Sequence, residues 1–180
     1  MGAGRKHTVE APKRRRSNVI RVDFAPSRKR LAFSLYSKAC DLDEKDPKEG
    51  ARLYMRAIHL DPTLWDAMSN LGRIYFTTGE FGAAENWWKR AIRTNQRAAD
   101  AYYNLGYLRL MKKDYQEAVT HFEMAIAAEP DFTDAFFNLG EALNKLGRRE
   151  EARACWRMHI ELRGEWVTEA RAALGLRVVK

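Results

Sequence analysis

Residues 99–132 read ADAYYNLGYLRLMKKDYQEAVTHFEMAIAAEPDF, and this stretch decides the fold. Its triplet Asn104-Leu105-Gly106 recurs 34 residues earlier, at 70–72, and 34 residues later, at 138–140. Other columns keep the same step. They are Asp66-Ala67, Asp100-Ala101 and Asp134-Ala135 before the triplet, Ala84, Ala118 and Ala152 after it, and the aromatic residues Trp88, Phe122 and Trp156. A fixed period of this length indicates a stack of similar units rather than one non-repeating core.

Apolar residues within each unit have helical spacing. Met68, Leu71 and Tyr75 lie at i, i+3 and i+7, which places them on one face of a helix that turns toward a core. The equivalent sets are Tyr102, Leu105 and the charged Arg109, and Phe136, Leu139 and Leu143. The glycine of each triplet falls inside such a helix, where it costs about 0.5–1 kcal/mol relative to alanine, so we expect a neighbouring helix to approach closely there. Gly79 and Gly147 are expected to end helices in the left-handed conformation.

These columns resemble the tetratricopeptide repeat (TPR), which has Leu-Gly and Tyr in its first helix and Ala-x3-aromatic-x2-Ala in its second. The resemblance is to proteins of the bacterial type and implies an all-α, right-handed superhelix. It implies four repeats, at 31–64, 65–98, 99–132 and 133–166, followed by a segment at 167–180 that carries most of a capping helix over 165–176. Nine helices are therefore expected. Ser34, Ser37 and Lys38 depart from the pattern, as suits a terminal repeat whose outer face meets solvent.

Nothing in the chain points to catalysis. The four histidines are scattered and have no partners at metal-ligand spacing, and no phosphate-binding loop or nucleophile motif appears. We therefore predict no catalytic residue, no metal, no cofactor and no enzyme activity. No apolar run reaches the ~18 residues of a membrane span, and a cytoplasmic location is expected. Cys40 and Cys155 are expected to be free, buried thiols in a reducing compartment.

The resemblance implies that the first helices of successive repeats line a concave groove that holds a protein partner or peptide. The candidate groove residues are Tyr36, Asp66, Asn70, Arg73, Asp100, Tyr103, Asn104, Tyr107, Asp134, Phe137, Asn138 and Glu141, with Leu35, Ala39 and Ser69 beside them. An asparagine in each repeat offers an amide donor and acceptor to a peptide backbone, and the aromatic side chains offer apolar anchors. In the competing interpretation the aspartates only complement helix N-termini and the asparagines are structural.

One subtype of the family does not match. Members that clamp a chaperone's C-terminal carboxylate use basic residues in the first and third helices, where this chain has Leu35, Ala39, Asp100 and Asn104. An acidic groove would repel such a ligand, so we do not expect a chaperone-tail clamp.

Residues 1–30 form a basic arm that is expected to be largely disordered. They hold ten lysine and arginine residues against Glu10 and Asp23, which accounts for the whole formal net charge of +8. Ile20, Val22 and Phe24 alternate with charged residues, a pattern typical of a short strand. Ala25-Pro26-Ser27 is expected to break the chain and cap a first helix that starts at about Arg28.

Several functions remain open for the arm. The residues expected to dock or to contact a polyanion are Lys13, Arg14, Arg15, Arg16, Ile20, Val22, Phe24, Arg28, Lys29 and Arg30. They suit a solubilising tail, contact with nucleic acid or another acidic surface, a segment bound by a partner, or a nuclear import signal. The chain's own acidic groove is one such surface. Two functions follow: an adaptor that holds a peptide in its groove, which we favour, or a nucleic-acid-associated regulator whose arm contacts phosphates.

Overall fold

The structure is a computed structural model that describes residues 25–163 of the 180-residue chain. All regular secondary structure in these residues is helical, which confirms the all-α prediction. The helices are α1 (Ala25–Leu42), α2 (Pro47–Leu60), α3 (Trp65–Thr77), α4 (Phe81–Thr94), α5 (Ala99–Met111), α6 (Tyr115–Ala128), α7 (Thr133–Lys145) and α8 (Arg149–Arg163). The predicted capping helix, the strand-like segment at 20–24 and the basic cluster at 13–16 lie outside the described residues.

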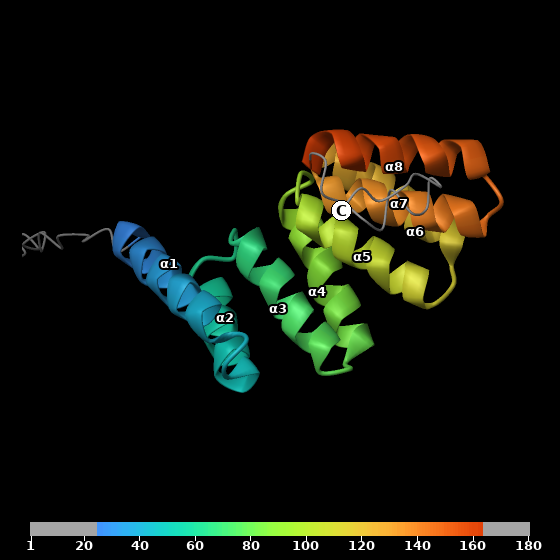
Figure 1. Cartoon of the computed structure of the whole chain (residues 1–180). Coiled ribbons are helices and arrows are strands. Elements are labelled where there is room, and N and C mark those ends of the chain that lie inside the picture. The colour runs from blue at the N-terminus through green and yellow to red at the C-terminus, as the bar shows by residue number, and fades with distance from the viewer. Residues whose placement is uncertain (1–24, 164–180) are drawn as a thin grey trace, which may run out of the picture.

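Consecutive helices pair into hairpins, α1 with α2, α3 with α4, α5 with α6 and α7 with α8, and the hairpins stack side by side into a solenoid (Figure 1). Between hairpins, α2 packs on α3, α4 on α5 and α6 on α7. The first helices of neighbouring hairpins also meet, α3 with α5 and α5 with α7. None of the described helices combines the length and apolarity needed to cross a membrane.

The first helix starts earlier than expected. Helix α1 begins at Ala25 rather than at about Arg28, so the prediction of a breaker at 25–27 with Ser27 as the cap is wrong. The physical reason is that Pro26 stands in the first turn, where a helix has no intrahelical partner for the N–H group that proline lacks. Arg28, Lys29 and Arg30 therefore belong to the first two turns of α1.

The predicted close approach at the triplet glycines is confirmed, and the neighbour is the aromatic column. A Cβ atom on Gly72 would lie 2.5 Å from the indole nitrogen of Trp88, and one on Gly106 would lie 2.8 Å from the Phe122 ring. Gly140 meets Trp156 in the same way. Each glycine thus makes the room in which the second helix of its hairpin seats a large ring.

The predicted left-handed conformation of the two turn glycines is confirmed. Gly79 and Gly147 have positive φ, +85° and +81°, at the ends of α3 and α7. The equivalent position after α5 is Lys113, a non-glycine residue with φ of 64°.

Charged Arg109 in the core stripe of α5 has ion pairs with Glu85 at 2.6 Å and Glu117 at 2.7 Å, which explains how a cation is tolerated there.

Candidate functional site

The A-face is the surface formed by the candidate groove residues on the first helix of each hairpin, α1, α3, α5 and α7. Most of these side chains are half-buried, and Asp100, Tyr107 and Glu141 are exposed. Two of the neighbouring residues predicted with them are buried instead, Ala39 at 0% and Ser69 at 3% exposure. Ala39 belongs to the hydrophobic core, and the Ser69 carbonyl accepts a hydrogen bond from the buried Trp88 indole, so the prediction that these two line the groove is wrong.

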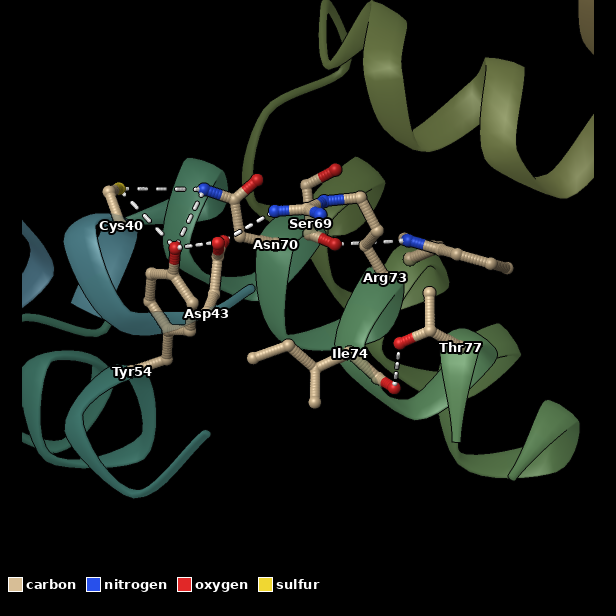
Figure 2. A network of polar contacts seen from close by, with 9 residues as sticks. Cys40, Asp43, Tyr54, Ser69, Asn70, Arg73, Ile74 and Thr77 are labelled. Atoms are coloured by element: carbon tan, nitrogen blue, oxygen red, sulfur yellow. Dashed lines mark hydrogen bonds and ion pairs between the residues drawn. The ribbon is translucent and has the colours of Figure 1, made fainter. Parts of the chain in front are cut away.

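Asn70 and Arg73 are held by a polar network between the first two hairpins (Figure 2). The Asn70 amide donates to the Tyr54 hydroxyl at 3.2 Å, and that hydroxyl donates to the Asp43 carboxylate at 3.0 Å. Arg73 forms an ion pair with the same carboxylate, which is only 8% exposed. These two groove candidates therefore already have partners within the chain.

Cys40 borders this network. The Tyr54 hydroxyl lies 3.3 Å from its sulfur atom, and the Asn70 amide lies 3.9 Å from it. Cys40 is exposed, so the prediction that it is buried is wrong: the network covers only one side of it. Cys155 is partly buried, and burial raises the pKa of its thiol to about 11.

A second set of contacts holds the A-face at the last hairpin. The Asn138 amide donates to the Tyr103 hydroxyl at 2.8 Å. The Tyr103 ring stacks on Phe132 with 4.9 Å between centroids, and the Phe137 ring lies 5.4 Å from the imidazole of His159. Tyr103, Phe137 and Asn138 thus contribute to packing between α5, α7 and α8.

Asn104 and Tyr107 lie between these two sets, one turn apart on α5. Among the residues that the structure describes, the half-buried Asn104 side chain has no hydrogen-bond partner. The Tyr107 side chain is 40% exposed and meets Phe76 of α3 edge-on at 5.9 Å. An amide with free hydrogen-bonding capacity beside an accessible aromatic ring is what an extended peptide needs, a backbone partner and an apolar anchor.

Acidic side chains lie on the first turns of α3, α5 and α7. Burial raises the pKa of Asp66, and the neighbouring Asp100 carboxylate raises it further. Asp100 is exposed, but partial desolvation of its carboxylate by the surrounding protein also raises its pKa. Asp134 differs because its carboxylate lies 3.4 Å from the Arg163 guanidinium. Burial raises the pKa of nearby Tyr36 to about 12 and keeps its hydroxyl protonated.

The family models match this architecture. One tetratricopeptide repeat model matches residues 70–131 and a second matches residues 109–174. The chain belongs to the tetratricopeptide repeat family. The two matches together cover the three copies of the Asn-Leu-Gly triplet, whereas the exact repeat boundaries given above stay predictions.

Solved structures resemble this chain over 66–77% of its length. A crystal structure of MamA is 26% identical, with a TM-score of 0.65 over 77% of this chain and 86% of that chain. PilF of Pseudomonas aeruginosa is 19% identical, with a TM-score of 0.69 over 76% and 63%. The first TPR of Spaghetti (RPAP3), solved with the HSP90 peptide SRMEEVD, is 22% identical, with a TM-score of 0.61 over 66% and 95%. No curated protein sequence matches the chain significantly.

Cavities near this TPR surface add residues that sequence reasoning missed. A cavity of about 150 Å³ on the A-face is lined by Tyr103, Asp134, Phe137, Asn138, His159 and Arg163. His159 had one signal in the sequence, since it replaces alanine in a repeat column, but Arg163 had none. Glu141 lines a different cavity of about 240 Å³ with residues of α8, so it faces the last hairpin rather than Asn104.

Another cavity, of about 390 Å³, lies between α1 and α2. Leu31, Met55 and Leu60 form its apolar wall, and Arg52, Arg56 and His59 complete the lining. The described residues contain no group of three or more His, Cys, Asp or Glu side chains placed to hold a metal ion.

Proposed function

We propose that this TPR chain is a non-enzymatic scaffold that binds an extended peptide segment of a protein partner on the A-face, centred on Asn104 and Tyr107. The observation that supports this site is the difference within one column. Asn70 and Asn138 are hydrogen-bonded to tyrosines of the chain, whereas Asn104 has no partner among the described residues. A free amide in a half-buried position is unfavourable unless a ligand or water satisfies it, and a peptide backbone offers both a donor and an acceptor.

The charge of the A-face indicates a basic peptide. Asp66 and Asp100 have no ion pair with any residue in 25–163, so a lysine or arginine of the partner would find two uncompensated carboxylates within one repeat of Asn104. The peptide in the RPAP3 structure is acidic, SRMEEVD, and would be repelled by this surface. The proposed ligand is therefore positively charged, whereas the peptide in the RPAP3 structure is negatively charged.

The test is selection of peptides from a displayed library against the full chain, followed by fluorescence anisotropy with the peptide that binds best. Asn104→Ala is expected to lower the affinity for that peptide about tenfold, because a backbone hydrogen bond in a partly buried site contributes about 1–2 kcal/mol. The matched control is Asn86→Ala on the exposed side of α4, which should leave the affinity unchanged. Equal effects of the two substitutions would place the binding site elsewhere.

The nucleic-acid alternative depends on two basic clusters and stays a prediction. Lys13–Arg16 lies outside the described residues, whereas Arg28, Lys29 and Arg30 are exposed on α1. No contact of the described residues favours it over the peptide scaffold.

A further inference from the structure

The N-terminal end of α1 lies at the acidic edge of the A-face. In the 34-residue register, Trp65 at the start of α3 corresponds to Leu31, so α1 extends six residues, about 9 Å, beyond the starts of the other first helices. Hydrogen bonds from Thr63 lower the pKa of Asp61, and the nearby Lys29 ammonium lowers it further. The beginning of α1 therefore lies near Asp61 in the α2–α3 connection, five residues before Asp66.

The three first-turn aspartates at this edge are not equivalent. Asp134 is paired with Arg163, but Asp66 and Asp100 have no cation partner within residues 25–163. Burial is the main cause of the raised pKa of Asp66, and the negative charge of Asp100 adds to it. The Tyr36 ring on α1 lies near Asp66, whereas the Phe76–Tyr107 pair lies farther along α3 and α5, ten residues after Asp66 and seven residues after Asp100. The face thus combines an unmatched negative charge with apolar rings.

Residues 13–24, KRRRSNVIRVDF, have the complementary chemistry. They contain five cationic side chains against Asp23, and Ile20, Val22 and Phe24 alternate with polar residues. An extended segment places such alternate residues on one side and the intervening ones on the other. Apolar side chains on one side can therefore face the Tyr36 ring, while Arg21 and Arg14–Arg16 are free to reach the carboxylates.

We propose that residues 13–24 bind across the first turns of α3 and α5 in the same molecule, with their basic side chains opposite Asp66 and Asp100. This inference rests on the proposed function, because the arm then occupies the peptide site and partner peptides must displace it. The arm therefore competes with partner peptides for this site, so only partners that bind more tightly than the tethered arm displace it.

The reach of the segment is sufficient. Arg21 lies four residues before Ala25, which spans up to about 13 Å, and Arg16 lies nine residues before it, up to about 30 Å. Helix α1 packs on α2, α2 packs on α3, and α3 meets α5. At about 8–10 Å between the axes of packed helices, the axes of α3 and α5 lie no more than about 20 Å and 30 Å from that of α1, which the nine residues up to Arg16 can span. A short tether gives an effective concentration of millimolar order, so even a segment with a Kd of about 100 μM would occupy the site most of the time.

The experiment measures competition in the full chain. The probe is a fluorescein-labelled synthetic peptide of residues 13–24, added in trans and followed by anisotropy. Neutralising the arm with Arg14→Gln, Arg15→Gln, Arg16→Gln and Arg21→Gln is expected to tighten binding of the probe about tenfold, because the tethered competitor is lost. Raising the salt concentration should lower the affinity for the probe, since salt screens interactions between exposed charges.

A second comparison locates the contact. In the chain with the four arginine substitutions (the arm-neutral chain), the double substitution Asp66→Asn and Asp100→Asn should lower the affinity for the probe about tenfold. The double substitution Asp114→Asn and Glu123→Gln changes the net charge equally at exposed positions away from the A-face, and should leave the affinity for the probe unchanged. Circular dichroism of each variant confirms that the helices are intact.

Three results would overturn the proposal: equal affinity of the probe for wild-type and arm-neutral chains, equal effects of the two carboxylate pairs, or no binding of the probe at all. A wild-type dimer in sedimentation that the arm substitutions convert to a monomer would also overturn it, because the arm would then bind a second copy. If the probe fails while a library peptide still binds in an Asn104-dependent way, this inference is wrong and the proposed function stands. If neither binds at the A-face, both are wrong.

Discussion

Of the three hairpins that carry the Asn-Leu-Gly triplet, the middle one, α5–α6, differs from the hairpins on either side of it. In α3–α4 and α7–α8 the aromatic column holds tryptophan. The Trp88 indole donates to the Ser69 carbonyl at 3.1 Å, and the Trp156 indole donates to the Phe137 carbonyl at 3.2 Å. In α5–α6 the same column holds Phe122, which has no polar hydrogen to donate.

The asparagine column follows the same division. The residue after each tryptophan-bonded carbonyl is an asparagine that is itself hydrogen-bonded to a tyrosine, Asn70 to Tyr54 and Asn138 to Tyr103. Asn104 in the middle hairpin lacks both supports within residues 25–163. The difference teaches that one column of a repeat can be structural at two positions and available for a ligand at the third, so family position alone does not define a binding residue.

The largest expected effect tests the flanking hairpins. Trp88→Ala should lower the free energy of unfolding by about 3–5 kcal/mol, because Trp88 is 1% exposed and its removal leaves a large cavity beside Gly72. Trp156→Ala, at 5% exposure, should behave alike. Urea unfolding followed by circular dichroism measures both.

Trp87 is the matched control for this prediction. It precedes Trp88 on α4, is only partly buried, and has the Arg90 guanidinium 5.0 Å above its ring. Trp87→Ala should lower the free energy of unfolding clearly less than Trp88→Ala does. Equal losses for the two neighbours would mean that the aromatic column has no special part in the core.

The second prediction concerns binding by the middle hairpin. Asn104→Ala combined with Tyr107→Ala should weaken the library-selected peptide about 30-fold, or about 2 kcal/mol, since an anchor and a backbone contact are lost together. Thermal melting should show that the fold persists. Wild-type affinity in this double variant would move the site to another surface, such as the cavity beside Leu31 and Met55.

The third prediction compares stability along the asparagine column. Asn70→Ala should be about 1 kcal/mol less stable than Asn104→Ala, because only Asn70 loses an internal hydrogen bond. The gain in helix propensity from alanine is common to both variants and cancels in the difference. Urea midpoints measured side by side decide it. Equal stabilities would show that the Tyr54 network contributes nothing through Asn70.

Much of the fold could be predicted from the sequence because its determinants repeat. The 34-residue columns locate the helices, and Met68, Leu71 and Leu105 are buried as their spacing indicates. The glycine of each triplet points to a close neighbour for the same local reason. Such features depend on contacts that every repeat makes, so three copies of one pattern reinforce each other.

The candidate site was harder to predict because its distinctions come from residues that do not repeat. The partners of Asn70 and Arg73 are Tyr54 and Asp43 in the first hairpin, which departs most from the family pattern. Arg163, which neutralises Asp134, lies on the last turn of α8, where no column marks it. Helical periodicity shows which residues share a face, but not which of them already have partners there.

The smallest expected effect concerns the outer side of the middle hairpin and depends on pH. His121 of α6 is partly buried, and burial lowers its pKa; the Arg109 and Lys89 charges lower it further, against the opposing effect of Glu117 and Glu85. The folded chain therefore binds a proton at His121 less readily than the unfolded chain, whose pKa is about 6.5. Stability is full above pH 6.5 and is lost as the pH falls from there toward the folded pKa. His121→Gln should remove the part of the stability loss that comes from protonating His121. The free energy of unfolding is measured for wild type and variant at pH 8 and at pH 5.5. Its change between these pH values should differ between the two chains by a fraction of the ~1.4 kcal/mol that one pKa unit represents. Parallel stability curves for the two chains between these pH values would show that the ionic cluster of Glu85, Arg109 and Glu117 leaves His121 free to protonate.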